Sequence, residues 1–297
     1  MGMKQILVMM VAAAVLVGCE KFSPPVKIAN PLIEESVRIS LQKPKGKLTE
    51  ADLRKVTALS LSFTTITDAD FKEVAKLKKL NWLHLGGTKV TNVGIKELAK
   101  LQKLEGINLN NTKINDAGLK EVAKLQNLNE LHLDGTEITN AGIKELAKLQ
   151  KLETLYLNYT QITDASLREL ARLEKLVVLR LAFTQITGTG LKELARLQNL
   201  NELHLGYTQI TDAGLKGVAK LQNLGTLYLT GTKVSNVGIK DLAKLQNLEW
   251  LSVQNSQITD AGVYELQRVL PNCTIPLDKL PDTNKTHKSK TRKSKTP

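Results

Sequence analysis

Three of the four histidines in this 297-residue chain could form a metal site, because they share one position of a repeating sequence phrase. His84, His132 and His204 each stand fifth in a 24-residue unit, and imidazole nitrogen is a common zinc ligand. If the units stack as neighbouring strands about 4.8 Å apart, His84 and His132 lie roughly 10 Å apart at the backbone. Zinc requires its ligand nitrogens about 2 Å away. We therefore expect surface histidines that bind no metal and no cofactor.

The other reactive side chains do not form a catalytic constellation in the sequence. The chain has two cysteines, Cys19 and Cys273, which are too few for a disulfide framework or a four-cysteine zinc site. There is no glycine-rich phosphate loop between strand and helix, and no nucleophile elbow. In the expected fold the thiol of Cys273 has no histidine near it. The sequence predicts no catalytic residues, and hence a protein that is not an enzyme.

The repeating phrase predicts the architecture that positions these residues. Apolar residues at unit positions 1, 4 and 6 alternate as in a strand, and those at positions 16, 19 and 22 have helical spacing. A Thr or Asp before the helical part can cap the helix. A strand this short cannot bury its apolar face alone, so the units must stack. Nine units follow one another without insertion and begin at Val56, Leu80, Leu104, Leu128, Leu152, Leu176, Leu200, Leu224 and Leu248.

The phrase LxxLxLxxTxITDAGLKELAKLQN resembles the leucine-rich repeat, in the helix-bearing form of F-box-type receptors and many bacterial envelope proteins. The resemblance covers residues 56–271. It implies an α/β leucine-rich repeat solenoid, with a curved parallel strand ladder on the concave side and helices on the convex side. Thr or Ser replaces the usual Asn or Cys at position 9. We expect this hydroxyl column to satisfy backbone groups as the chain leaves each strand.

The amino terminus has the pattern of an export signal. A basic residue, Lys4, precedes an apolar run over residues 6–17 that is short for a membrane span. The next residues, Gly18 and Cys19, complete a stretch that resembles the lipobox of bacterial lipoproteins. The resemblance implies that residues 1–18 are a signal peptide and that Cys19 is lipidated. We then expect an exported protein anchored to the bacterial membrane, facing the periplasm or the cell surface; an ordinary secretory signal is the alternative.

The segments outside the repeats are expected to close the stack and extend beyond it. Residues 19–55 form an anchor linker and a helical cap, in which Asn30 and Thr49 can cap short helices. Residues 272–277 form a final strand with Cys273 facing the core. Residues 278–297 contain almost nothing apolar and are expected to be a disordered basic tail. The tail is either simply solvated or attracted to an anionic membrane or polymer.

The unit positions that vary predict the ligand-binding face. Positions 2, 3, 5, 7 and 8 point into the concave face of the expected fold, and they hold eight of the eleven aromatic residues. Tyr, Trp and Arg dominate protein interfaces because they bury much area and keep a polar group. We expect a protein or peptide ligand; alternatively, aromatic rings at position 8 only shield neighbouring repeats. The predicted ligand-binding residues are Trp82, Tyr156, Tyr159, Val178, Arg180, Phe183, His204, Tyr207, Tyr228 and Trp250.

Regular charges on the convex side give a second hypothesis. Positions 17 and 21 hold seventeen basic residues against eight acidic residues at position 18, where only Gly217 breaks the pattern, and the chain carries a net charge of +13. Such a face usually promotes solubility. It could also let a structural or adhesive envelope protein bind anionic polymers or membrane. We do not expect nucleic acid as a partner, because no aromatic residues interleave with these lysines. We expect a monomer.

Overall fold

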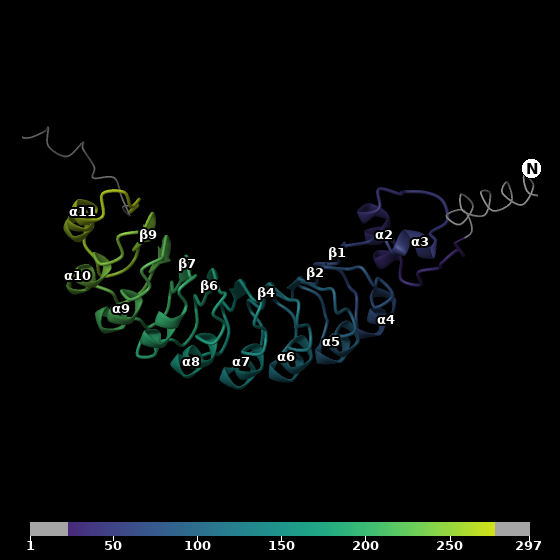
Figure 1. Ribbon diagram of the computed structural model, residues 1–297, viewed down its shortest axis with the longest axis horizontal. Helices are drawn as coiled ribbons and strands as arrows, with labels where there is room; N and C mark the ends of the chain where they lie inside the picture. Colours follow the sequence, from purple (N-terminus) through teal and green to yellow (C-terminus); the bar gives the residue numbers. More distant parts are fainter. Residues whose placement is uncertain (1–22, 277–297) are drawn as a thin grey trace, which may run out of the picture.

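The apolar alternation at unit positions 4 and 6 produces a ladder of nine short parallel strands. The computed structural model describes residues 23–276, and the strands form one sheet in sequence order. The sheet lines the concave side of an arc whose convex side carries the helices (Figure 1). The α/β leucine-rich repeat solenoid predicted from the sequence is therefore confirmed. The strands are β1 (Ala58–Ser60), β2 (Trp82–His84), β3 (Gly106–Asn108), β4 (Glu130–His132), β5 (Thr154–Tyr156), β6 (Val178–Arg180), β7 (Glu202–His204), β8 (Thr226–Tyr228) and β9 (Trp250–Ser252).

Each strand pairs with the next at an offset of one 24-residue unit. Leu155 in β5, for example, is in register with Leu179 in β6, which is in register with Leu203 in β7. These central leucines are fully buried, whereas the residues on either side of them face the concave surface. The alternation therefore sends unit position 4 into the core and positions 3 and 5 to the face that could bind a ligand.

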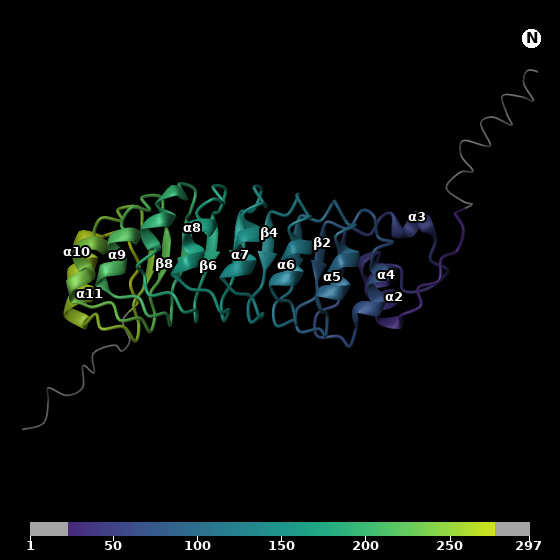
Figure 2. The same cartoon turned by 90° about the horizontal axis from the view of Figure 1, so that it is seen from below.

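The convex side is built from one short helical segment per unit (Figure 2). Within the repeats the α-helices are α4 (Phe71–Val74), α5 (Asn92–Leu98), α6 (Asp116–Val122), α7 (Asn140–Leu146), α8 (Leu167–Leu170), α9 (Asp212–Val218), α10 (Ile239–Leu242) and α11 (Asp260–Val269). The 3₁₀ segments are η1 (Asp68–Asp70), η2 (Asp164–Ser166), η3 (Leu191–Arg196) and η4 (Asn236–Gly238). The expectation of one helix per unit needs one correction, because the sixth unit has only the 3₁₀ segment η3.

The threonine hydroxyls at unit position 9 close the turn after the first eight strands. The Oγ1 atom of Thr208 donates to the carbonyl of Leu205 at 2.6 Å, and Thr88 makes the same bond to Leu85 at 2.7 Å. Both threonines are buried, so their hydroxyls need an internal partner. The predicted structural role of this column is confirmed.

The amino-terminal end of the stack is covered by two capped helices. Helix α2 (Pro31–Ser40) begins after Asn30, whose Oδ1 accepts from the amide of Leu32 at 2.9 Å. Helix α3 (Glu50–Leu53) begins after Thr49, which forms a capping box with Asp52. Both predicted capping residues therefore cap a helix, and Ile33 and Val37 of α2 join the core of the repeats.

At the other end, the chain adds one β-bridge beyond β9, between Trp250 and Thr274. Cys273 is buried next to it, and burial raises the pKa of its thiol to about 11. A thiol with this pKa is protonated at neutral pH and is a poor nucleophile. The signal peptide, the lipidation site Cys19 and the basic tail lie outside the described residues. Within residues 23–276, no helix combines the length and hydrophobicity needed to cross a bilayer.

Candidate ligand-binding face

The side chains at unit positions 3 and 5 form a row of contacting rings and charges along the concave face, here called the strand row. At its amino-terminal end, Trp82 stacks on His84 with ring centroids 4.6 Å apart. Further along, His132 stacks on Tyr156 at 4.1 Å, and the guanidinium of Arg180 lies 4.1 Å above the centre of the Tyr156 ring. A cation above an aromatic ring is attracted by the ring quadrupole. These side chains therefore hold one another in place before any ligand arrives.

Arg180 is held from its other side by a carboxylate. Its Nη2 and Nε atoms donate to Oε1 of Glu202 at 2.9 and 3.2 Å. Nε2 of His204 lies 2.8 Å from the same oxygen but is not aligned for a hydrogen bond. The ring of His204 packs against Tyr228 with centroids 4.0 Å apart. The strand row from Tyr156 to Tyr228 is thus one connected, half-buried network.

The two histidines of this network are poor proton acceptors. Burial, followed by repulsion from Arg180, lowers the pKa of His204 to about 4, although Glu202 opposes the shift. Burial also lowers the pKa of His132. Both rings are therefore neutral at pH 7. No group of three or more His, Cys, Asp or Glu side chains that could hold a metal ion occurs in the described part of the chain.

The lowered pKa of His204 predicts a loss of stability in mild acid. The histidine pKa in the unfolded chain is about 6.5, so at pH values between about 4 and 6.5 the unfolded chain binds a proton that the folded chain does not bind. Lowering the pH from about 6.5 to about 4 should therefore reduce the free energy of unfolding by roughly 2 kcal/mol through this residue. Urea denaturation across this pH range should show a shallower pH dependence in His204→Gln. Parallel pH profiles for the two proteins would contradict the assignment.

A second row, here called the turn row, occupies unit position 8 just after each strand. Tyr159, Phe183 and Tyr207 stack face to face, with centroid distances of 4.2 and 4.4 Å and interplanar angles of 12° and 13°. These rings are 60%, 41% and 46% exposed. Three large rings kept in solvent and spaced like the repeats form a ready hydrophobic surface, because an exposed apolar patch of this kind usually marks an interaction site.

The backbone of the turn row is left-handed in all nine units. Gly87, Gly135 and Gly231 adopt this conformation freely, and Asn tolerates it. Tyr159, Phe183 and Tyr207 adopt it at φ values of 58°, 56° and 54°, where a bulky residue is uncommon and strained. Placing rings here costs stability that Asn or Gly would avoid, which favours a role outside folding. The turn row consists of Phe63, Gly87, Asn111, Gly135, Tyr159, Phe183, Tyr207, Gly231 and Asn255.

The rings of the turn row also cover neighbouring backbone. A Cβ atom added to Gly231 would come within 2.6 Å of the Tyr207 ring, and one added to Gly87 within 2.5 Å of Phe63. Phe63 and Tyr207 therefore lie against the glycine of the next repeat, whereas Gly135 lies against Asn111. The shielding expected as the alternative explanation does occur at Gly87 and Gly231. It does not account for Tyr159 and Phe183, which lie against other rings.

Unit position 7, expected to vary freely, is structural in the middle repeats. Oδ1 of Asn110 accepts from the amide of Asp134 at 2.8 Å, Asp134 does the same for Asn158, and Asn158 for Ala182. Burial raises the pKa of Asp134 against these hydrogen bonds. The Oδ1 atoms of these side chains therefore satisfy backbone groups of the next repeat, which fixes the residue type at this position.

The structure divides the predicted site residues between these two rows. Tyr156, Arg180, His204 and Tyr228 meet in the strand row, and Tyr159, Phe183 and Tyr207 meet in the turn row. Trp82 joins the strand row two repeats away, through an edge contact with His132 at 6.1 Å.

The two other predicted residues stand beside these rows. Val178 is half-buried and in register with Glu202, whereas Trp250 has no ring contact among residues 23–276. Sequence reasoning left out Glu202 and Glu130, which bind the network together. Their signal was a Glu two residues before a His, which occurs in the fourth and seventh units.

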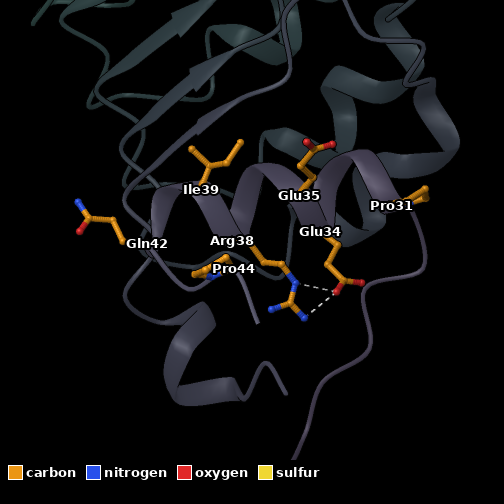
Figure 3. Close-up of a pocket in the computed structure, with 7 residues that line it drawn as sticks. All are labelled: Pro31, Glu34, Glu35, Arg38, Ile39, Gln42 and Pro44. Carbon is orange, nitrogen blue, oxygen red and sulfur yellow. Dashed lines mark hydrogen bonds and ion pairs between the residues drawn. The ribbon is translucent and has the colours of Figure 1, made fainter. Parts of the chain in front are cut away.

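A depression of about 610 Å³ lies elsewhere, on the outer side of α2 (Figure 3). Arg38 in its lining pairs with Glu34 at 2.8 Å, as Figure 3 shows, and the lining also includes Ile39 and Pro44. An i to i+4 ion pair of this kind stabilises an exposed helix. None of the predicted ligand-binding residues lines this depression.

The nine-strand ladder and the helical convex side define a solenoid of stacked strand-and-helix repeats. Comparison with family models agrees: a leucine-rich repeat region matches residues 47–205, and a single leucine-rich repeat matches residues 196–219. The chain belongs to the leucine-rich repeat family. No curated protein sequence matches it.

Solved structures show the same architecture. The chain is similar to internalin C2 from Listeria monocytogenes, with 30% identity and a TM-score of 0.56, over 84% of this chain and 94% of that one. The functional domain of InlJ from the same species shares 17% identity, with a TM-score of 0.55, over 81% and 53% of the two chains. A plant peptide hormone receptor, RGFR1, in complex with RGF2, shares 16% identity, with a TM-score of 0.52, over 77% and 41%.

Proposed function

We propose that this chain is a non-enzymatic binding protein that recognises a protein or peptide ligand through its concave face. The observation that carries the proposal is the exposed stack of Tyr159, Phe183 and Tyr207 on strained backbone, beside the strand row centred on Arg180. Aromatic and arginine side chains supply most of the binding energy in protein interfaces. Packing holds these groups in place, so a ligand loses little affinity to ordering them.

The similar structures support this kind of partner. The plant receptor of the same fold is seen in complex with RGF2, so an arc of this type can hold such a ligand. A curved parallel ladder offers one side chain per repeat at regular spacing. An extended segment laid across the repeats would meet Tyr156, Arg180 and Tyr228 in turn.

The binding protein is further proposed to be a bacterial lipoprotein, anchored to the membrane through lipid on Cys19. The support is the lipobox-like stretch that ends at this residue. Replacing Cys19 by Ser in the full chain should move the protein from the membrane fraction to the soluble fraction after export. The matched change Cys273→Ser, at the buried second cysteine, should leave the protein in the membrane fraction. Membrane association that survives Cys19→Ser would exclude the anchor.

The rival hypothesis is an adhesive envelope protein that acts through convex charge. The structure weakens it, because six units pair the basic residue at position 21 with the acid at position 18, as in Lys124 with Glu121 at 2.7 Å. Paired surface charges leave less net attraction for a polyanion.

Capture of a partner from envelope and culture extracts at low and at high salt distinguishes the two hypotheses. Contacts through rings survive high salt, whereas contacts through exposed charge are screened. A partner retained at high salt supports concave-face recognition. A partner that high salt releases, from envelope and culture extracts alike, would instead favour binding through the convex surface.

A further inference from the structure

At one junction between repeats on the convex side, glycine replaces the usual residue at two unit positions. Position 13 is Asp or Asn in eight units but Gly188 in the sixth, and position 18 is acidic in eight units but Gly217 in the seventh. Both glycines lie where η3 meets α9. The interruption is local, because the neighbouring units on both sides keep the ordinary residues.

The missing residue at position 13 normally joins consecutive repeats. In the other seven junctions its side-chain oxygen accepts from the amide at position 12 of the next repeat, as Asp116 does from Thr139 at 2.9 Å and Asp212 from Ser235 at 2.8 Å. Gly188 offers Thr211 no such oxygen. The hydroxyl of Thr211 makes no capping hydrogen bond either, unlike that of Thr139.

The missing residue at position 18 changes the charge of the same junction. In six units, including repeat 8 with Asp241 and Lys244, the acid at position 18 pairs with the basic residue three positions later. Lys220 has Gly217 in that place. Among the ion pairs of residues 23–276, none includes Lys220, and none includes Lys192 or Lys216, which stand at position 17, where the basic residues of the other units are also unpaired.

These three lysines line one pocket of about 280 Å³. The other lining residues are Thr187, Gly188, Thr189, Thr211, Ala213, Gly214 and Gly217. The lining contains three cationic groups, three threonines and no carboxylate. Its lining residues come from the start of the η3 segment and from α9, on the helical side of the arc (Figure 1).

Asp164, which binds the lining residue Thr187, and Asp212, which follows the lining residue Thr211, are both engaged in the fold. Asp164 accepts from the hydroxyl of Thr187 at 2.6 Å and from the amides of Gly188 and Gly190 at 3.0 and 3.1 Å. Asp212 accepts from the hydroxyl and amide of Ser235 at 2.7 and 2.8 Å. Neither carboxylate forms an ion pair with the pocket lysines in the described chain.

We propose that the pocket between η3 and α9 binds a phosphate group. Lysine ammonium groups bind phosphate as point charges, and charged hydrogen bonds are about twice as strong as neutral ones. A phosphate oxygen can accept from Thr211 as the Asp or Asn side chain does at the other junctions, while Lys192, Lys216 and Lys220 neutralise its charge. The site is on the opposite side from the concave face, so it is independent of the ligand proposed above.

Calorimetric titration of the full chain with inorganic phosphate, at constant ionic strength set by sodium chloride, tests the proposal. The double variant Lys216→Gln, Lys220→Gln should bind phosphate at least about tenfold more weakly, which corresponds to about 1.4 kcal/mol. The matched control is Lys120→Gln, Lys124→Gln, which removes the same charges from the same unit positions of repeat 3, where Glu121 is present. The control should bind phosphate like the original chain.

Vesicles distinguish the two sources of such a phosphate group. Sedimentation with phosphatidylglycerol vesicles that falls in the pocket variant but not in the control assigns the phosphate to a lipid headgroup. Equal sedimentation of both variants, with the phosphate titration still selective, assigns it to a soluble phosphate compound. No saturable heat from the original chain, or equal weakening of both variants, would overturn the proposal, since the lysines would then act only as general positive charge.

Discussion

A variant carrying Tyr159→Asn, Arg180→Ala and Tyr207→Asn is expected to lose about 4 kcal/mol of ligand-binding free energy, roughly a thousandfold in Kd. The three side chains lie in adjacent repeats and represent both rows of the concave face. Removing the two tyrosines dismantles the stack around Phe183, and removing Arg180 separates Tyr156 from Glu202. The measurement is the affinity for the partner captured from envelope extracts.

The substitutions are chosen so that the fold is kept. Asn111 and Asn255 already occupy the turn row at φ values of 53° and 55°, so Asn fits the left-handed backbone at residues 159 and 207. Urea denaturation should therefore show no loss of stability at the two turn positions. The matched control is Phe63→Asn, which makes the same change in the turn row at a ring that is 84% exposed and lies outside the stack.

The control decides between recognition and shielding. Binding that survives Phe63→Asn and fails in the triple variant supports the concave face as the ligand site. Equal affinity of the triple variant and the original chain would remove the basis of the proposed function, because the exposed stack and Arg180 would then contribute nothing to recognition.

The repeats could be predicted because every unit repeats the same burial pattern. Leu155, Leu179 and Leu203 occupy the same unit position and are all fully buried in register. Stacking also makes each contact recur, so a pattern read in one unit applies to all nine. The structural role of the threonines at position 9 could be predicted for the same reason, since the same hydroxyl recurs at the same place in successive units.

The detailed geometry of the concave face was less predictable. The left-handed turn at position 8 had a signal in the glycines and asparagines of that column, but Tyr159, Phe183 and Tyr207 concealed it, since rings rarely adopt this conformation. Nothing in the spacing showed that Arg180 would turn toward Glu202, because side-chain direction depends on neighbouring repeats. The histidines lie deeper than expected since flanking rings cover them.

The second large effect is expected at the convex junction, where Gly217→Ala should lower the free energy of unfolding by about 2 kcal/mol. A Cβ at this position would lie 2.5 Å from the amide nitrogen of Lys192 and 2.7 Å from the carbonyl carbon of Leu191. Both contacts are with backbone, so a rotamer change cannot relieve them. Either η3 or α9 must move, which disturbs the packing of Leu191 and Leu215.

The intrinsic preference for Ala over Gly in a helix acts in the opposite direction, by up to about 1 kcal/mol. The sign of the measured change therefore tells which effect is larger. Glu121→Ala at the same position of repeat 3 is the control and should cost at most about 0.5 kcal/mol, the value of an exposed ion pair with Lys124. If urea denaturation shows Gly217→Ala to be as stable as the original chain, the backbone of repeat 6 shifts to accommodate the added methyl group at little cost. Gly217 would then permit the close approach of η3 and α9, but the fold would not require it.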